Sequence, residues 1–378
     1  MAFDTFKKRW KLLAVSILLV AAPATFLGYV NYKVAVSSTK LQVENNMKKQ
    51  ALLAAQAAAR AHAQITEVDR LNRERANSIV VEEVEAVYQL ARMYKDKERL
   101  KNALSKIVVG KTGYPWILDY NGTLVLSKKR QIDGVNIWGA KDSTGWLHVQ
   151  SVIKESRKLK DGQTYIHVYT WQNPDDKTTR DKVAATVHFP KWKWILGIST
   201  YYDELYDAGY EDKILESVKR QLAEIVVGKT GYVFALGCKG KDKGQYLISE
   251  HRLHDGEDTL KIWDSKGKPV FQTMVNKALS LKKNEAVIIE SSWKDPENNE
   301  YRTRISSFTY IPEMDWLVGS TAYLDEFLSD LEPLKYQTLW IVLLSILVGS
   351  AVVYYTAEDI IQSVKSSGTT REKLLGRR

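Results

Sequence analysis

The residues best suited to binding chemistry alternate along one stretch of the chain. Tyr165, His167, Tyr169 and Trp171 occupy every second position, and Lys182 follows after a polar segment. A lysine ammonium offers a full charge and three hydrogen-bond donors, and aromatic rings can enclose a small ligand. A charge-assisted hydrogen bond to a carboxylate is about twice as strong as a neutral one. The combination therefore predicts a site for a small carboxylate.

Trp116, Trp146 and His148 complete the predicted ligand-binding set. Tryptophans would exclude water from such a site, and the histidine would supply a further hydrogen-bond donor. Each residue type also has a structural interpretation. Lys182 could form an ion pair that only stabilises the fold, and the tryptophans could pack in a core. The histidines could be satisfied by hydrogen bonds within the protein.

The alternation predicts a β-hairpin with two different faces. If Trp171 lies opposite Lys182, then Tyr165 lies opposite His188, and the polar and aromatic side chains share one face. The other face carries Ile166, Val168, Val183, Ala185 and Val187. These apolar residues are expected to pack on the core, against a long helix.

An identical octapeptide, IVVGKTGY, occurs at Ile107–Tyr114 and again at Ile225–Tyr232. A repeat of this length is far beyond chance expectation and indicates two copies of one module. The two copies also end alike, in WILGISTYYDEL at Trp194–Leu205 and WLVGSTAYLDEF at Trp316–Phe327.

The polar and aromatic candidates occur in only one of the two copies. The residues of the second copy that match Tyr165, His167, Tyr169, His148 and Trp146 are Val287, Ile289, Ser291, Val270 and Lys268. A purely structural role would predict similar residues in both copies. The first module is therefore the predicted ligand-binding copy, and the second is a spacer near the membrane.

Two apolar segments bracket the modules, and each is close to the ~20 residues that cross a bilayer. Basic residues precede the first segment and follow the second, which predicts that both termini are cytoplasmic. A cleaved signal peptide is the alternative for the first segment. The predicted boundaries are 1–11, cytoplasmic N-terminus; 12–30, first transmembrane helix; 31–105, helical stalk; 106–205, membrane-distal module; 206–222, helical connector; 223–327, membrane-proximal module; 338–355, second transmembrane helix; and 356–378, cytoplasmic tail.

No Gly or Pro occurs from Asn31 to Val109, and good helix formers dominate this stretch. A long helix is expected there, with a break at Asp96 that caps a short second helix. Such a rod is typical of helices that pack on a partner chain, so a homodimer is expected. Each module is expected to hold about five antiparallel strands and one embedded helix, which makes the fold class α+β.

The repeated GKTGY, the Trp, Pro and Lys or Arg of the hairpin, and the WxxGxxxYxDE ending resemble the double Cache sensor domain, of the second type, of bacterial transmembrane receptors. The resemblance covers about 31–327. It implies PAS-like antiparallel sheets behind a long helix, and membership among chemoreceptors, sensor kinases or cyclic-dinucleotide enzymes. It also implies that the distal module holds a short carboxylate, amino acid or amide.

The predicted function is therefore a periplasmic sensor that passes a ligand signal through the second transmembrane helix. The output is expected from a domain missing here or from a cytoplasmic partner. The alternative is a membrane-anchored Cache scaffold without a ligand.

Several other functions find no support in the residues. The net charge of +10 comes without a nucleic-acid motif. The Gly that a phosphate loop requires before GKT is replaced by Ser105 and Ala223. His251 and His254 lack partners for a metal site. Asp203-Glu204 and its repeat are interpreted as helix caps, so no catalytic residue, cofactor or metal is predicted.

Overall fold

The protein is described from a computed structural model that covers residues 2–172, 178–206, 209–294 and 299–352, with side chains from residue 22 onward. The predicted cytoplasmic tail, 356–378, lies outside these residues. The chain forms two compact units, Arg60–Ser217 and Met1–Ala59 with Val218–Arg378. The first unit contains the first module and the second unit contains the second module.

The long helix and its break are as expected. Helix α1 runs over Ala2–Met93 and contributes to both units, and α2 covers Lys97–Leu104. The carboxylate of Asp96 accepts hydrogen bonds from the backbone N–H groups of Glu98 and Arg99. These bonds satisfy helix N–H groups that have no partner within the helix, so the predicted cap is confirmed.

The first module is a five-stranded antiparallel sheet with strand order β2-β1-β5-β4-β3. Its elements are β1 (Tyr114–Asp119), β2 (Leu124–Leu126), η1 (Lys128–Arg130), α3 (His148–Ser156), β3 (Thr164–Trp171), β4 (Arg180–Phe189), η2 (Pro190–Trp192), β5 (Trp194–Tyr201) and η3 (Tyr202–Glu204). The predicted number of about five strands is confirmed, and the predicted embedded helix begins at His148.

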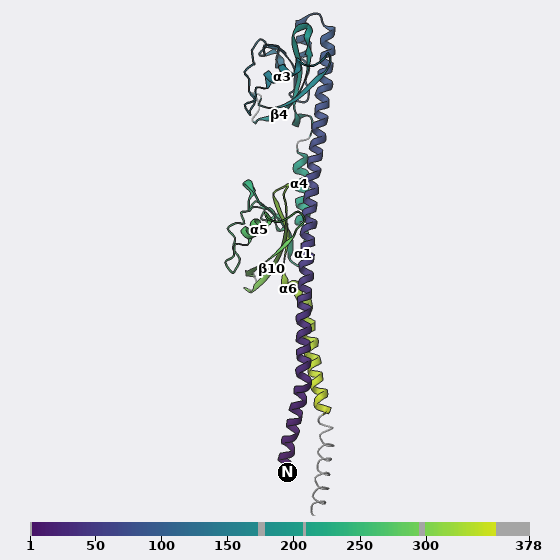
Figure 1. Cartoon of the computed structure of the whole chain (residues 1–378), viewed down its shortest axis with the longest axis vertical. Helices are drawn as coiled ribbons and strands as arrows, with labels where there is room; N and C mark the ends of the chain where they lie inside the picture. Colours follow the sequence, from purple (N-terminus) through teal and green to yellow (C-terminus); the bar gives the residue numbers. More distant parts are fainter. Residues whose placement is uncertain (1, 173–177, 207–208, 295–298, 353–378) are drawn as a thin grey trace, which may run out of the picture. The chain divides into compact units, whose positions relative to one another are not determined.

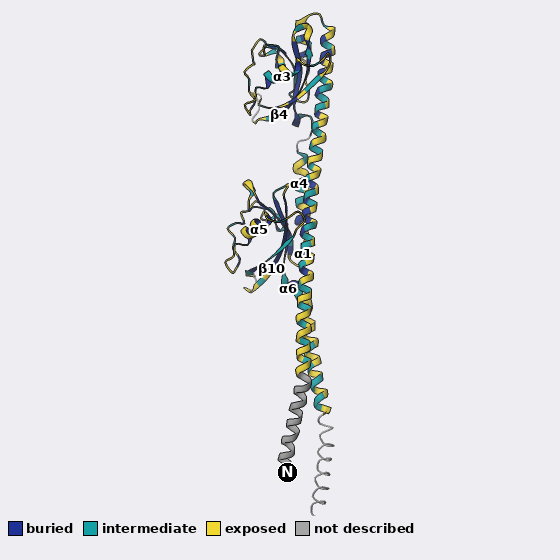
Figure 2. Ribbon diagram, in the orientation of Figure 1, coloured by how far each residue is buried: buried dark blue, intermediate teal, exposed yellow. Residues whose placement is uncertain are grey.

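The two faces of this sheet carry different helices. Val80, Val84 and Val87 of α1 belong to one buried cluster with Val183 and Leu196 of the sheet. On the other face, α3 packs through a second cluster that includes Val149, Val152 and Ile153 with Leu118 and Ile195. Figures 1 and 2 show α1 along the sheet and the buried residues of the strands beside it.

The hairpin has a different register from the predicted one. Lys182 lies opposite Tyr169, and Trp171 lies opposite Arg180, two residues away from the expected pairing. Strand β4 begins at Arg180, two residues before Lys182. The Arg180 guanidinium stacks on the Tyr201 ring at 3.7 Å and pairs with Asp203 at 3.1 Å, which holds this residue in the strand. A two-residue shift keeps every side chain on its predicted face, because the side-chain period of a strand is two.

The apolar face of the hairpin is only half buried, contrary to the prediction. Val183 and Ala185 of β4 are buried in the α1 cluster. Ile166 and Val168 of β3 are 38% and 42% exposed. The physical reason is the position of β3 at the edge of the sheet. The described core between α1 and the sheet draws on β1, β2, β4 and β5.

The strands of the second module that match those of the first have the same order, β8-β7-β11-β10-β9, and the short β6 pairs with β7 as an additional strand. Its elements are α4 (Tyr210–Ala223), β6 (Val226–Val227), β7 (Gly231–Gly237), η4 (Gly240–Asp242), β8 (Tyr246–Ile248), η5 (Glu250–Arg252), α5 (Val270–Ala278), β9 (Val287–Lys294), β10 (Tyr301–Ile311), β11 (Trp316–Tyr323), α6 (Leu324–Leu328) and η6 (Ser329–Leu331). This module also contacts α1, where the Ser320 hydroxyl donates to the Met47 carbonyl at 3.2 Å and Lys40 pairs with Glu290 at 2.6 Å.

The repeated GKTGY loop binds a glutamate from the end of its own module. In the first module, Glu204 accepts hydrogen bonds from the backbone N–H groups of Lys111 at 3.0 Å and Thr112 at 2.7 Å. The Thr112 hydroxyl donates to its other oxygen at 2.5 Å. Gly110 has φ +63°, a conformation that L side chains rarely adopt. The GKTGY loop therefore joins the start of each module to its end through this glutamate, and it does not serve as a phosphate loop.

The second module repeats this closure with Glu326, which accepts the backbone N–H groups of Lys229 at 2.7 Å and Thr230 at 3.1 Å. The paired carboxylates lie in the first turn of a short helix, as predicted, in η3 and in α6. The predicted capping role is wrong for both glutamates, because neither helix has a side-chain cap hydrogen bond. Both glutamates cap a loop that is distant in sequence.

The second unit contains a helix that could cross a membrane. Leu324–Val352 is the one segment of the described residues that is long and apolar enough by composition. The predicted first span, 12–30, is helical within α1 but remains a prediction, because side chains before residue 22 are not described. A Cβ on Gly28 of α1 would collide with Cγ2 of Thr338, so the two helices are in contact there.

We expect Glu204→Gln to destabilise the first module by about 2 kcal/mol, because three donors of the GKTGY loop lose a charged acceptor. Burial opposes ionisation of Glu204, but hydrogen bonds from Thr112 and Lys111 outweigh it and hold the pKa below its usual range. This stabilisation is present above the unfolded pKa of about 4.5 and is lost as the pH falls through the folded pKa. Urea unfolding from pH 7 to pH 3 would measure both effects. Asp203→Asn is the matched control, and equal losses in the two variants would contradict the prediction.

Candidate ligand-binding site

A cavity of about 470 Å³ lies in the first module between the sheet and α3. Six of the eight predicted residues line it, namely Trp116, His148, His167, Tyr169, Trp171 and Lys182. They come from β1, α3, β3 and β4, so four separate elements position them. This volume is within the range of roughly 300–1,000 Å³ that is typical of small-molecule sites.

The other two predicted residues lie outside the lining. Trp146 precedes α3 and is 37% exposed, with its ring 6.4 Å from that of His148. Tyr165 stacks on His167 at 5.6 Å, one step further along β3. At that level of the sheet Thr186, the partner of Tyr165, bonds to Ser156 of α3 at 2.7 Å. Helix and sheet are in direct contact there, which explains why Tyr165 is not part of the cavity.

Lys182 supplies a buried positive charge to the cavity wall. Its side chain is on the same face as Tyr169, and the residue is only 1% exposed. The ammonium lies 4.8 Å from the centre of the Tyr114 ring and 5.2 Å from that of Tyr201. Aromatic faces attract a cation through their ring quadrupoles. A carboxylate that enters the cavity would add a charge interaction with this ammonium group.

A column of stacked rings forms another wall. Tyr169 stacks on His148 at 4.7 Å and on His167 at 5.5 Å, both nearly parallel. Both histidines are more than nine-tenths buried. The Nδ1 atom of each has no hydrogen-bond partner among the described residues. An unpartnered buried nitrogen costs free energy, which a ligand group or a bound water would recover.

Burial makes these ring systems resist ionisation. Loss of hydration lowers the pKa of His167 to about 3, and repulsion from His148 adds to the effect. Burial also lowers the pKa of His148, although Asp142 opposes the shift. The pKa of Tyr169 is raised, chiefly by burial. At neutral pH the two imidazoles of the cavity are therefore neutral.

Several lining residues were not predicted. Lys128, Lys129 and Gln131 come from η1 and the residue after it, and Tyr114 begins β1. The remaining unpredicted lining residues are Ser127 and the apolar or small Leu118, Leu124, Ile132, Ile137, Ala140, Val149 and Val152. Some of them could have been found by comparing the two copies, because Leu124, Val149 and Val152 match different residues in the second module.

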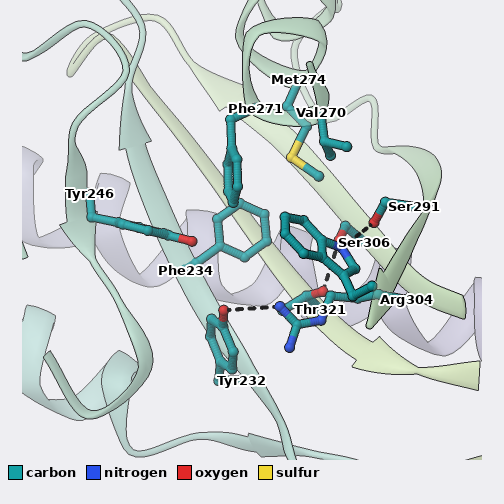
Figure 3. Close-up of a pocket in the computed structure, with 11 residues that line it drawn as sticks. Tyr232, Phe234, Tyr246, Val270, Phe271, Met274, Ser291, Arg304, Ser306 and Thr321 are labelled. Atoms are coloured by element: carbon teal, nitrogen blue, oxygen red, sulfur yellow. Dashed lines mark hydrogen bonds between the residues drawn. The ribbon is translucent and has the colours of Figure 1, made fainter. Parts of the chain in front are cut away.

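The corresponding space in the second module is nearly filled. Only about 10 Å³ remains there, within a lining that includes Phe234, Phe271, Met274 and Trp293. Figure 3 shows the Phe271 and Phe234 rings and the Met274 side chain converging on this space. About one water molecule is the most that such a volume could hold.

Side-chain size at three positions accounts for the filling of the second module. The larger residue is in the second module for the aligned pairs Leu124 and Tyr246, Val149 and Phe271, and Val152 and Met274. The opposite holds for Trp116 and Phe234, His148 and Val270, and Tyr169 and Ser291. The cation is common to both modules, since Arg304 matches Lys182 and lies 4.7 Å from Tyr323 and 5.7 Å from Tyr232. What distinguishes the first module is the open volume and the histidines around the cation.

The comparisons identify the family. The family model dCache_2, described as a Cache domain, matches residues 29–328, which is most of the chain. The chain therefore belongs to the Cache domain family, and the resemblance found in the sequence is confirmed.

Individual relatives cover different parts of the chain. The sensor histidine kinase MctS of Rhizobium johnstonii is 27% identical over 111 residues, which are 29% of this chain and 23% of that protein. The chain thus spans about a quarter of the length of this curated relative. A methyl-accepting chemotaxis protein of Vibrio parahaemolyticus is 20% identical, covering 39% of this chain and 99% of its own, at TM-score 0.29. The ligand-binding domain of the amino acid chemoreceptor PctB of Pseudomonas aeruginosa, solved with L-Gln, is 12% identical, covering 79% and 99%, at TM-score 0.25.

The depressed pKa of His167 predicts a loss of stability in mild acid. The unfolded state binds a proton below pH ~6.5 while folded His167 stays neutral to about pH 3, so stability falls as the pH drops through that window. We expect the free energy of unfolding to be about 2 kcal/mol lower at pH 5 than at pH 7, and His167→Phe to remove most of that difference. Urea titrations at the two pH values measure it. A variant with the same pH dependence as the original chain would show that His167 is not the group responsible.

Proposed function

We propose that the chain is the sensory part of a bacterial transmembrane receptor, and that a small organic carboxylate binds in the first module. The single observation that carries the proposal is the cavity of about 470 Å³ in one module against about 10 Å³ in the other. Both modules share a strand order, a loop closure and a cation between two tyrosines. Only one of them retains room for a ligand.

The chemistry of the lining favours an anion. Lys182 contributes a buried charge, and the Nδ1 atoms of His148 and His167 offer unfulfilled hydrogen-bonding positions nearby. Trp116, Tyr169 and Trp171 would exclude water from a bound carboxylate. An amino acid or an amide is the other ligand class that the resemblance implied. The proposed role is binding without catalysis, so the chain itself is proposed to have no enzymatic activity, cofactor or metal.

Membership in the Cache family and the apolar Leu324–Val352 helix support a location outside the cytoplasm, next to the membrane. In this proposal 12–30 forms a second span beside it, both termini are cytoplasmic, and the modules are periplasmic. The contact between Gly28 and Thr338 is consistent with paired spans. A homodimer would transmit the signal through the second transmembrane helix to an output domain or a cytoplasmic partner.

The first test is a ligand screen on the full chain in detergent, followed through its thermal unfolding. A carboxylate at ~100 times its dissociation constant should add about 2.7 kcal/mol of stability. We expect Lys182→Gln to weaken binding at least about tenfold, because a charge-assisted bond is lost. Arg304→Gln, the matched change in the second module, should leave the affinity unchanged. Equal effects of the two changes would refute binding in the first module. A panel without any response would favour the ligand-free scaffold.

A second test fills the cavity with the residues of the second module. The variant Leu124→Tyr, Val149→Phe and Val152→Met should fold, because the homologous α5 and β8 accommodate these side chains on the same scaffold. We expect it to lose binding of any ligand found in the screen by at least about a hundredfold, since the volume is occupied. Isothermal titration calorimetry measures the affinity. Retained affinity in the folded variant would place the ligand elsewhere.

A further inference from the structure

Two lysines reach the cavity from a loop that is anchored by other residues. The Asp133 carboxylate accepts the Ser127 backbone N–H at 2.8 Å and the Ser127 hydroxyl at 2.9 Å. It also accepts the Arg130 Nε–H at 3.0 Å. With the loop held in this way, the side chains of Lys128 and Lys129 line the cavity. Lys129 is exposed and Lys128 is partly buried, so this loop forms a side of the cavity that is open to solvent.

The second module shows that the loop does not need these lysines for its fold. Ser249, Arg252 and Asp255 make the same bonds there, with distances of 2.7 to 2.8 Å. Both loops contain two successive residues with positive φ, Lys129 and Arg130 in one and His251 and Arg252 in the other. The residues matching Lys128 and Lys129 are Glu250 and His251. The two lysines accompany the open cavity and are absent where the space is filled.

The loop and the buried lysine bring two positive charges to one wall. The Lys128 ammonium lies 5.7 Å from the Tyr114 ring centre, and the Lys182 ammonium lies 4.8 Å from the same centre. Like charges near a poorly solvated surface repel each other, and an anionic ligand would relieve this repulsion. Lys182 is buried while the loop faces solvent, so the two charges occupy different depths. Apolar side chains, among them Leu124, Ile137 and Val152, line the same cavity.

We propose that the ligand is a dianion, with one anionic group at Lys182 and a second at Lys128 and Lys129, joined by an apolar or aromatic middle. This inference rests on the proposed carboxylate-binding function and specifies its ligand class. The cavity of about 470 Å³ suits such a molecule better than a ligand of two or three carbons, which would leave most of the apolar lining without contacts. The second anionic group of the ligand would bind the ammonium groups of Lys128 and Lys129, which are flexible and can each donate three hydrogen bonds.

The experiment compares matched ligands on the full chain in lipid nanodiscs by isothermal titration calorimetry. The probes are α,ω-dicarboxylates from succinate to suberate with straight-chain monocarboxylates of equal length, and the three benzenedicarboxylates with benzoate. We expect the best dicarboxylate to bind at least about tenfold more tightly than its monocarboxylate match. Lys128→Glu with Lys129→His, which installs the residues of the second module, should remove this gain and leave monocarboxylate affinity within about threefold. Lys154→Gln with Lys160→Glu, at two exposed sites on the same module, changes the net charge by the same amount and is the matched control.

Two results would overturn the dianion. One is equal affinity for monocarboxylates and dicarboxylates in every pair, and the other is an equal loss of both classes in the double variant. In either case a carboxylate site would still exist, and only this inference would fail. If no probe of either class binds, the proposed carboxylate-binding function fails with it. The ligand comparison on the unaltered chain decides the matter even if the double variant does not fold.

Discussion

A sheet has two faces, and in each module α1 can cover only one of them. In the first module, Val80 and Val84 of α1 bury one face against Val183 and Leu196. What covers the other face then decides what the module can do. Where α3 presents Val149 and Val152, space remains for a ligand, and where α5 presents Phe271 and Met274 the space is nearly filled. The filling comes from a few side chains, Phe271 and Met274 on one short helix and Tyr246 on β8. Such small changes suffice because protein interiors are otherwise packed with few voids.

The cavity is also electrostatically selective because its polar groups lose hydration together. Burial makes the imidazole of His167 neutral, whereas Lys182 lies between the rings of Tyr114 and Tyr201. Neutral imidazoles can donate or accept one hydrogen bond at each nitrogen without adding charge, so among the described lining residues at this depth Lys182 is the one that would set the sign. The same cation in the second module, Arg304, has no comparable volume beside it. A shared cation therefore acquires a binding role only where the packing leaves room.

Much of the architecture could be predicted from the residues, because repeats and alternation report local geometry directly. The duplicated GKTGY indicated two modules, Asp96 the helix break, and the alternation around His167 the face of the hairpin. The hairpin register was missed, since a period of two cannot distinguish shifts of two residues. The exposure of Ile166 was missed because it depends on whether α1 extends as far as the edge strand β3, which the residue pattern does not report. The cavity was only partly foreseen: hairpin residues mark its wall, but its volume depends on Val149 and Val152, whose small size is informative only beside Phe271 and Met274.

Under the proposed function, a signal must leave the cavity through the sheet, and β4 offers a direct route to α1. Lys182 faces the cavity, and its neighbour Asp181 points the other way, to Arg73 of α1 at 3.5 Å. On the adjacent strand end, Tyr201 contacts the Lys182 charge while the hydroxyl of Tyr202 donates to Asn77 of α1 at 2.9 Å. Two pairs of consecutive residues, Asp181 with Lys182 in β4 and Tyr201 with Tyr202 at the step from β5 to η3, thus connect the cavity to α1. A ligand that draws Lys182 inward would strain the Asp181 and Tyr202 contacts, and it could bias α1 only by the difference in its affinity for the two arrangements.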